Sequence, residues 1–248
     1  MRVSRLLTDE QLRQRQALSL ESKITLSEQR IWDWYQSWAG EVYISFSGGK
    51  DSTVLRHLVK KRFPDVPAVF CDTGLEYPEV RSFALANADA VIKPEKTFKE
   101  VIETEGYPFP TKEQAQYIRE AKHTKSEKLR QCRLTLQPSR HYCISRKWLF
   151  LMDAPFEVSE KCCDVMKKKP FDRYEKSSGK RPFLGTMACE SGLRRKNYLQ
   201  YGCNAFFSKR PKSTPLGFWT EQDVLEYIVK YGLDYASCYG EIVQENGE

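Results

Sequence analysis

The feature that most constrains this chain is a pair of glycines placed between an apolar run and an amphipathic stretch. Residues Ser45 to Ser52 read SFSGGKDS and directly follow the apolar run Val42 to Ile44. A bare glycine pair most often marks a surface turn, because glycine reaches positive φ without steric penalty. Here, however, apolar residues recur at helical spacing from Ser52 to Arg62, and the stretch ends in three cations. The order strand, glycine loop and helix therefore predicts a functional loop rather than a plain surface turn.

The sequence predicts that this loop binds an anion. In this order the N–H groups of the loop and the positive end of the helix dipole converge on one point, where a phosphate or sulfate is stabilised. Lys50 adds a full positive charge, and the hydroxyls of Ser47 and Ser52 can donate hydrogen bonds. Asp51 has two open interpretations, a ligand for a metal ion or a cap for the helix. A Walker A loop reads G-x-x-x-x-G-K-[ST], and this stretch does not, which disfavours an ordinary P-loop NTPase.

Composition bounds the class of protein. The chain has 248 residues, of which 40% are hydrophobic and 12% aromatic, so a disordered chain is excluded and one domain over 1–248 is expected. No apolar stretch reaches the roughly 20 residues of a membrane span. The start lacks the apolar core of a signal peptide, which predicts a cytoplasmic protein. In that compartment eight cysteines indicate thiol, metal or cluster chemistry before disulfides.

Strand and helix signals alternate along the chain. An aromatic stripe from Ser27 to Trp38 predicts a core-facing helix within an N-terminal helical segment, 1–40. Further strands are predicted at 68–71, 89–94 and 182–187, and further helices at 78–87, before Tyr201 and after Thr220. This alternation predicts an α/β fold, a doubly wound and mainly parallel Rossmann-like sheet. The charged, less regular stretch 95–161 is interpreted as an insertion or lid.

Net charge is +7, and much of the excess lies between Arg119 and Lys147. Two interpretations stay open for this segment: a solvated helix followed by a loop, or a contact surface for nucleic acid.

Three polar clusters follow predicted strands, at 47–52, 72–76 and 186–195. Parallel sheets bind ligands beyond the carboxyl ends of their strands, where the strand order reverses. We therefore expect these clusters to form one site.

The motifs resemble a known family. SGGKDS after a strand, FCDTGLEYPEV downstream, and later GTMACESGLRR and TPLGFWTEQDVLEYI are similar to the motifs of the phosphoadenosine phosphosulfate (PAPS) reductase family. That family lies within the adenine nucleotide α-hydrolase superfamily of N-type ATP pyrophosphatases. The resemblance implies binding of ATP, adenosine phosphosulfate (APS) or PAPS, with Mg²⁺ as a further cofactor.

The resemblance also implies roles for individual residues. Lys50, Asp51 and Arg194 would take part in catalysis, and two arginines after the later strand would neutralise the anionic leaving part. A surface ion pair is the alternative interpretation for Glu190 and Arg194. The implied nucleotide-binding residues are Ser45, Ser47, Gly48, Gly49, Lys50, Asp51, Ser52, Asp72, Thr73, Gly74, Glu76, Gly185, Thr186, Glu190, Arg194 and Arg195.

The pair Cys162-Cys163 resembles the cysteine pair that holds two corners of a [4Fe–4S] cluster in some family members. Two buried structural thiols are the alternative. Neighbouring lysines predict a lowered pKa for both thiols. A cluster needs four thiolates, and Cys189, Cys203 and Cys238 do not match the family spacing. The polar end EIVQENGE, without the family's C-terminal cysteine motifs, predicts a chain shortened at its C-terminus.

Two function classes remain. The first is an enzyme of sulfur metabolism that either cleaves ATP at the α-phosphate to activate a substrate such as nucleic acid, or reduces APS or PAPS to sulfite. The second is a non-catalytic accessory subunit that binds nucleotide or nucleic acid. A homo-oligomer or a subunit of a complex is compatible with both.

Overall fold

The computed structural model describes residues 6–135 and 142–243, and it divides the chain into two compact units. Unit 1 contains residues 1–72, 76–92 and 174–248, and unit 2 contains residues 73–75 and 93–173. The predicted insertion, 95–161, falls within unit 2. Parts of the basic segment (136–141) and of the polar C-terminal end (244–248) lie outside the described residues.

Unit 1 is built on a parallel sheet. Its strands are β1 (Val42–Phe46), β2 (Ala68–Cys71), β3 (Ala90–Ile92) and β4 (Arg181–Leu184), and their spatial order is β3-β2-β1-β4. The chain therefore runs outward from β1 to β3 and then returns to the other side of β1. The strand order reverses between β1 and β4, so the end of β1 lies at a topological switch point.

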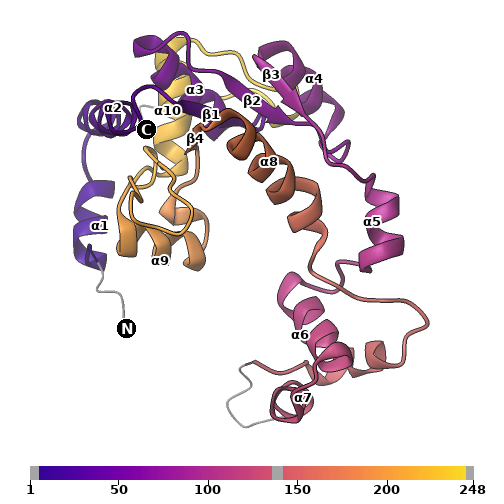
Figure 1. The fold of residues 1–248 in the computed structure, drawn as a ribbon. Helices are drawn as coiled ribbons and strands as arrows, with labels where there is room; N and C mark the ends of the chain where they lie inside the picture. The colour runs from indigo at the N-terminus through magenta and orange to yellow at the C-terminus, as the bar shows by residue number, and fades with distance from the viewer. Residues whose placement is uncertain (1–5, 136–141, 244–248) are drawn as a thin grey trace. The chain divides into compact units, whose positions relative to one another are not determined.

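Helices cover both faces of this sheet (Figure 1). On one face α3 (Lys50–Arg62) packs against β1 and contacts α2 (Leu20–Ser37) and α10 (Glu221–Tyr231), while α4 (Pro78–Asn87) packs on β2. On the other face Tyr43 of β1 meets Tyr174 of α8 (Lys169–Ser178) edge to face and donates a hydrogen bond of 2.9 Å to Glu175. The predicted doubly wound, mainly parallel fold is confirmed.

The remaining elements of unit 1 flank this core. They are α1 (Asp9–Gln16), α9 (Gly192–Tyr201) and two short 3-10 helices, η3 (Ala188–Glu190) and η4 (Ser237–Tyr239). Gly232 ends α10 in the left-handed conformation, as predicted from the sequence.

The aromatic stripe predicted for the N-terminal helix is part of the core. Ile31 and Trp34 are fully buried, and Tyr35 and Trp38 pack against the same cluster. The helix begins at Leu20, with Ser19 as its cap, and not at Ser27. The earlier turns bury Ile24 and also the polar residues Lys23 and Ser27, which interrupt the hydrophobic pattern. Lys23 is buried in an ion pair with Asp223.

Unit 2 is helical. It contains α5 (Phe98–Glu105), α6 (Lys112–His123), α7 (Glu127–Leu134), a 3-10 helix η1 (Arg146–Met152), a π-helical turn η2 (Asp164–Lys168) and the beginning of α8. One cluster of buried residues joins α6 to η1, and a second joins α5 to η2. Within the two described ranges, no helix has both the length and the apolar character needed to cross a bilayer.

Several cations of the basic segment have acidic partners inside unit 2. Arg119 pairs with Glu160 at 2.8 Å, and Arg133 pairs with Glu120 at 2.7 Å. These contacts neutralise part of the positive charge of the segment within unit 2. Contact of this segment with nucleic acid stays a prediction.

Candidate functional site

The glycine loop joins β1 to α3 through a compact hydrogen-bond network. The Ser52 hydroxyl accepts from the Ser47 N–H at 3.2 Å and donates to the Gly49 carbonyl at 2.9 Å. The Ser47 hydroxyl lies 3.1 Å from the Ser52 hydroxyl, and the Thr53 hydroxyl donates to the Gly49 carbonyl. These bonds lie within the loop and fix its shape, so its backbone is arranged before any ligand arrives.

The start of α3 differs from most helix starts in the described chain. A Ser or Thr side chain accepts from the first turn of α1, α2, α5, α6, α7, α9 and α10. In α3 the cap residue is Gly49, and no side-chain cap is present. The first N–H groups of a helix have no partner within the helix. At α3 these donors stand at the end of β1, where an anion can accept from them.

Gly48 is required by its surroundings. Its φ is +76°, and a Cβ built there would lie 2.7 Å from the Val80 carbonyl oxygen and 2.9 Å from the Ala84 Cβ of α4. A side chain at this position would meet backbone, which cannot move aside cheaply. The glycine therefore allows α4 to close directly against the loop.

The charged residues of the loop interact with α10. The Lys50 amine lies 3.5 Å from the Glu221 carboxylate, whose side chain is 75% exposed. Burial raises the pKa of Asp51, and Glu221 raises it further, while Lys50 and Arg194 oppose the shift. Arg194 thus acts electrostatically on Asp51. Its contact with a nucleotide stays a prediction.

The end of β4 touches the loop as well. A Cβ built at Gly185 would lie 3.0 Å from the Asp51 carbonyl oxygen, so this glycine permits a close approach between β4 and α3. Thr186 follows directly. Gly185, which directly precedes the predicted cluster 186–195, therefore lies against the loop. The convergence of the three clusters on one site stays a prediction.

Two other predicted residues have local partners. Glu190 forms an ion pair with Arg194, as the alternative interpretation expected, and also accepts from the Met187 N–H. The pair crosses a helix boundary, because Ser191 caps α9 between its two members. The Arg195 guanidinium is directed to Asp9 of α1 at 2.7 Å. Its role at a nucleotide stays a prediction.

In the second motif, residues 72–76, Asp72 forms an ion pair with Arg81. Asp72, at the end of β2, accepts two hydrogen bonds of 2.8 Å from Arg81 of α4, and its side chain is nearly buried. Glu76 acts electrostatically on the same arginine. Thr73 accepts from the Leu75 N–H, and Gly74 has a φ of +72°. Ser45 lies within β1, paired in register with Val69 and Leu184.

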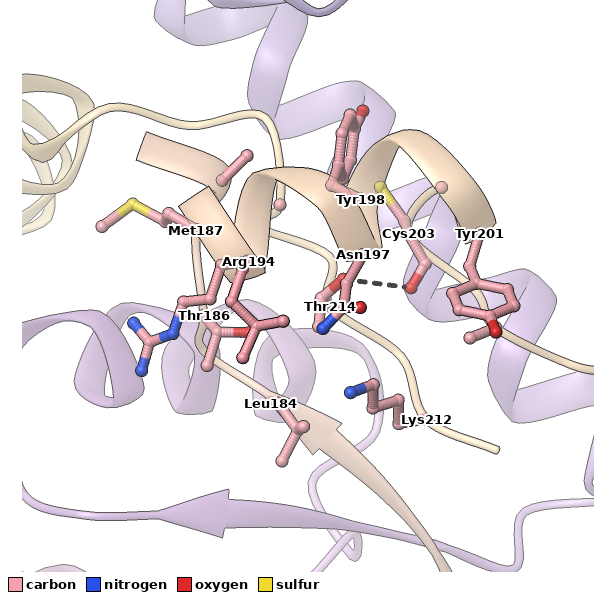
Figure 2. Close-up of a pocket in the computed structure, with 15 residues that line it drawn as sticks. Leu184, Thr186, Met187, Arg194, Asn197, Tyr198, Tyr201, Cys203, Lys212 and Thr214 are labelled. Carbon is pink, nitrogen blue, oxygen red and sulfur yellow. Dashed lines mark hydrogen bonds between the residues drawn. The ribbon is translucent and has the colours of Figure 1, made fainter. Parts of the chain in front are cut away.

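A cavity of about 230 Å³ lies beside the end of β4 (Figure 2). Thr186 and Arg194 line one part of it, and Asn197, Lys212 and Thr214 line another. Burial and the nearby Arg210 lower the pKa of Lys212. Sequence reasoning missed Asn197, Tyr201, Lys212 and Thr214, because nothing in their spacing signals that the segment after α9 folds back beneath it.

The two adjacent cysteines belong to unit 2. Their sulfur atoms lie 3.9 Å apart, with Cys163 exposed and Cys162 partly buried. Burial raises the pKa of Cys162, and so does Cys163, so the predicted lowering by neighbouring lysines is wrong for Cys162. Two of those lysines are engaged by acids, Lys161 with Glu105 and Lys168 with Asp164.

The described residues do not complete a cluster site. Cys189, Cys203 and Cys238 all belong to unit 1, and Cys203 is buried. Across 6–135 and 142–243, no group of three or more His, Cys, Asp or Glu side chains is arranged to hold a metal ion. A [4Fe–4S] cluster requires four thiolates, and a role for Cys162 and Cys163 as two of them stays a prediction.

A family model described as the phosphoadenosine phosphosulfate reductase domain matches residues 41–143 and 141–244. The chain belongs to this family. The resemblance drawn from the glycine loop and the later motifs is confirmed, and the matched ranges include the loop, the second motif, both adjacent cysteines and Arg194. Membership makes the chain a relative of sulfonucleotide reductases.

Individual relatives are more distant. The chain is 25% identical to an adenosine 5'-phosphosulfate reductase of Geobacillus kaustophilus over 206 residues, which are 81% of this chain and 68% of the relative. It is 24% identical to a phosphoadenosine 5'-phosphosulfate reductase of Yersinia enterocolitica over 205 residues, or 80% and 67%. An uncharacterised protein of Methanocaldococcus jannaschii is 42% identical over 69 residues, which are 26% of this chain and 17% of that protein.

Two solved structures are also similar. A PAPS reductase from Candida auris, in a phosphate complex, aligns with a TM-score of 0.49 and 17% identity over 98% of this chain and 96% of that one. The U34-tRNA thiolase NcsA of Methanococcus maripaludis, with its [4Fe-4S] cluster, aligns with a TM-score of 0.43 and 16% identity over 87% and 66%.

Proposed function

We propose that this PAPS reductase family protein binds an adenine nucleotide at the Ser47–Ser52 loop and cleaves ATP between its α and β phosphates. An oxygen or nitrogen of an acceptor attacks the α-phosphorus, an adenylate forms, and pyrophosphate leaves with the bonding electron pair. The observation that carries the proposal is the start of α3, which has no side-chain cap and stands at the switch point of the sheet.

The residues of the loop have complementary tasks in this reaction. Lys50 and the first N–H groups of α3 neutralise the charge that develops on the leaving pyrophosphate. Arg194 adds a planar cation whose charge acts on Asp51. Asp51 offers one carboxylate to Mg²⁺, which proteins commonly hold through one or two carboxylates together with substrate phosphates. A bound Mg²⁺ supplies further charge neutralisation to the phosphates.

Reduction of APS or PAPS is the second candidate, supported by the names of the relatives. It requires a thiolate that attacks the sulfur. Cys189 acts electrostatically with Asp51, but burial raises the pKa of this thiol, and Asp51, Glu221 and Asp223 raise it further. A protonated thiol is a poor nucleophile. Attack by Cys189 therefore requires that this thiol first loses its proton.

The test measures binding and turnover separately. Calorimetric titration of ATP, APS and PAPS into the protein and into Lys50→Ala should show a loss of affinity of at least about tenfold in the variant. Lys61→Ala is the matched control, because Lys61 lies at the other end of α3 and pairs with Glu28 at 3.1 Å. Equal affinity in Lys50→Ala and the parent protein would refute the site.

Turnover distinguishes the reactions and the accessory-subunit alternative. Pyrophosphate and AMP should form from ATP, with the rate increasing when the acceptor is added, and tRNA and DNA are the first acceptors to test. If nucleic acid binds through 119–147, affinity should fall steeply with salt. Formation of sulfite from APS or PAPS without any ATP cleavage would establish the second candidate. Nucleotide binding without either reaction would favour the accessory subunit.

The adjacent cysteines are also proposed as iron ligands. We expect the iron content of this chain to depend on Cys162 and Cys163. Purification without oxygen, followed by iron and sulfide assays of the protein and of Cys162→Ser with Cys163→Ser, tests this. Unchanged iron content in the double variant would exclude the two cysteines as ligands.

A further inference from the structure

The segment that follows α10 returns to the glycine loop and places an aromatic side chain against it. Tyr239, the last residue of η4, directs its hydroxyl toward Gly49: a Cβ built at Gly49 would lie 3.3 Å from the Tyr239 oxygen. The Lys50 amine lies 5.2 Å from the centre of the Tyr239 ring. Loop and ring belong to the same unit. The side chain therefore lies beside the same loop groups that are expected to receive phosphate.

The backbone of this segment is anchored on both sides of Tyr239. Ala236 is buried, and its carbonyl accepts from the Tyr239 N–H at 3.2 Å. Beyond the ring, the Tyr235 hydroxyl donates to the Gly240 carbonyl at 2.9 Å and accepts from the Ile242 N–H at 3.2 Å. η4 also contacts α4. These contacts hold the ring near the loop, while the side chain keeps 42% of its surface exposed.

The contacts that Lys50 makes here are weak. An ion pair with a mostly exposed carboxylate such as Glu221 contributes little stability, and a cation–π contact at a partly exposed ring is similarly weak. A phosphate group with two negative charges competes well with both. Lys50 can therefore turn to a ligand without a large loss.

The phenol of Tyr239 is suited to donate a hydrogen bond. Burial raises its pKa, and Cys238 and Asp51 raise it further, so the phenol stays protonated at neutral pH. A protonated phenol donates to an anionic oxygen, whereas a phenolate would repel it. Glu221 and Asp51 are the other acids near Lys50, and an ionised carboxylate accepts hydrogen bonds but cannot donate one. Tyr239 therefore adds a donor that these carboxylates do not supply.

From these contacts we propose that Tyr239 is a phosphate-binding residue, whose hydroxyl donates a hydrogen bond to the anion held by the Gly49–Lys50 loop and whose ring shields Lys50 from water. The proposal rests on the proposed function, because it assumes an anion at this loop. It extends the site to the segment after α10.

The experiment removes the hydroxyl of Tyr239, its whole ring, or the hydroxyl of a control tyrosine. ATP, inorganic pyrophosphate and adenosine are titrated calorimetrically into the parent protein, Tyr239→Phe, Tyr239→Ala and Tyr231→Phe. Tyr231 ends α10 and packs on Tyr227 and His57, so its variant removes a phenol hydroxyl from the same region without touching the loop. Tyr239→Phe should weaken ATP and pyrophosphate at least about tenfold, as expected for a bond to a charged oxygen. Tyr239→Ala should weaken them at least as much, and Tyr231→Phe should bind both like the parent.

Each other outcome decides against the proposal. If Tyr239→Phe binds ATP and pyrophosphate like the parent while Lys50→Ala loses both, the loop assignment stands and Tyr239 has no part in it. If either Tyr239 variant binds more tightly, the ring blocks the loop. If adenosine weakens as much as ATP, Tyr239 contacts the base. If the parent binds neither ATP nor pyrophosphate, the proposed function fails together with the inference.

A second measurement reports on the residue directly. 3-Fluorotyrosine introduced at position 239 should give a ¹⁹F resonance that shifts when pyrophosphate is added and does not shift with adenosine. A resonance that ignores pyrophosphate, although calorimetry shows it bound, would overturn the proposal.

Discussion

Two helices of unit 1, α10 and α3, differ in what caps the N–H groups of their first turn. At α10 the first turn is satisfied from within: the Thr220 hydroxyl accepts from the Asp223 N–H at 3.3 Å, and Asp223 accepts from the Thr220 N–H at 2.6 Å. Asp223 is itself paired with the buried Lys23 at 2.6 Å. At α3 the cap is Gly49 and no side chain takes that place.

The difference between the two helix starts predicts different effects of substitution on stability and on nucleotide affinity. Unpaired helix donors cost free energy unless a partner satisfies them, and α10 finds its partners in the protein. At the start of α3 no side chain caps the first turn, and the proposal gives that place to a ligand. The bonds among Ser47, Gly49 and Ser52 hold the shape of the adjacent loop. Substitutions at α10 should therefore change the free energy of unfolding, and substitutions at α3 should change nucleotide affinity as well.

The largest effect is expected at Asp223. Asp223→Ala leaves the Lys23 ammonium buried without its partner and removes half of the capping box, which should lower the free energy of unfolding by about 3–5 kcal/mol. Urea unfolding followed by tryptophan fluorescence measures it. Glu221→Ala, in the same turn but mostly exposed, should stay within about 0.5 kcal/mol. Equal stability of the two variants would show that the buried pair is not what holds α10.

Gly48→Ala should come next. The left-handed conformation costs a side chain about 1–2 kcal/mol, and overpacking against the Val80 carbonyl adds about 1–3 kcal/mol. Gly179→Ala is the control, because its φ is +74° and a Cβ built there would have nothing within 4 Å. The variants should differ by the packing contribution, and only Gly48→Ala should lose ATP affinity. Similar unfolding curves would mean that α4 can move away from the loop.

Thr220→Ala should lower the free energy of unfolding by about 1 kcal/mol, because it removes the cap of α10. Thr220→Ser keeps the hydroxyl and should restore most of that loss. Neither variant should change ATP affinity by calorimetry. A drop in ATP affinity with Thr220→Ala would show that the two helix starts are coupled, contrary to the separation drawn above.

The smallest effect concerns pH and Asp51. Its pKa is raised in the folded protein, so the folded state binds the proton more tightly than the unfolded chain does. Stability is therefore lost as pH rises from the unfolded carboxyl pKa, about 3.9, through the raised folded pKa. Asp51→Asn should remove this loss and exceed the parent at neutral pH by less than about 1 kcal/mol, since the group is partly exposed. Urea titrations at several pH values check it, and parallel pH profiles of the two proteins would contradict it.

Local sequence signals located most of unit 1. Short apolar runs gave the four strands, because buried parallel strands are continuously hydrophobic, and Thr220 with Asp223 marked the start of α10. The boundaries differ from the predicted ones in two places: β1 extends to Phe46, and α2 begins at Leu20, where its first turns bury Lys23 and Ser27 beside Ile24.

The sequence alone determined the α/β class, the family and the loop at the end of β1, since these follow from residues close together in the chain. Only the tertiary structure decided which distant groups meet there. It placed Gly185 against Asp51, directed Arg195 to Asp9, brought Lys212 beneath α9 and set Tyr239 against Gly49. The physical reason is that hydrophobic periodicity and turn residues report local conformation, whereas long-range contacts depend on how whole elements pack, which no spacing within one segment records.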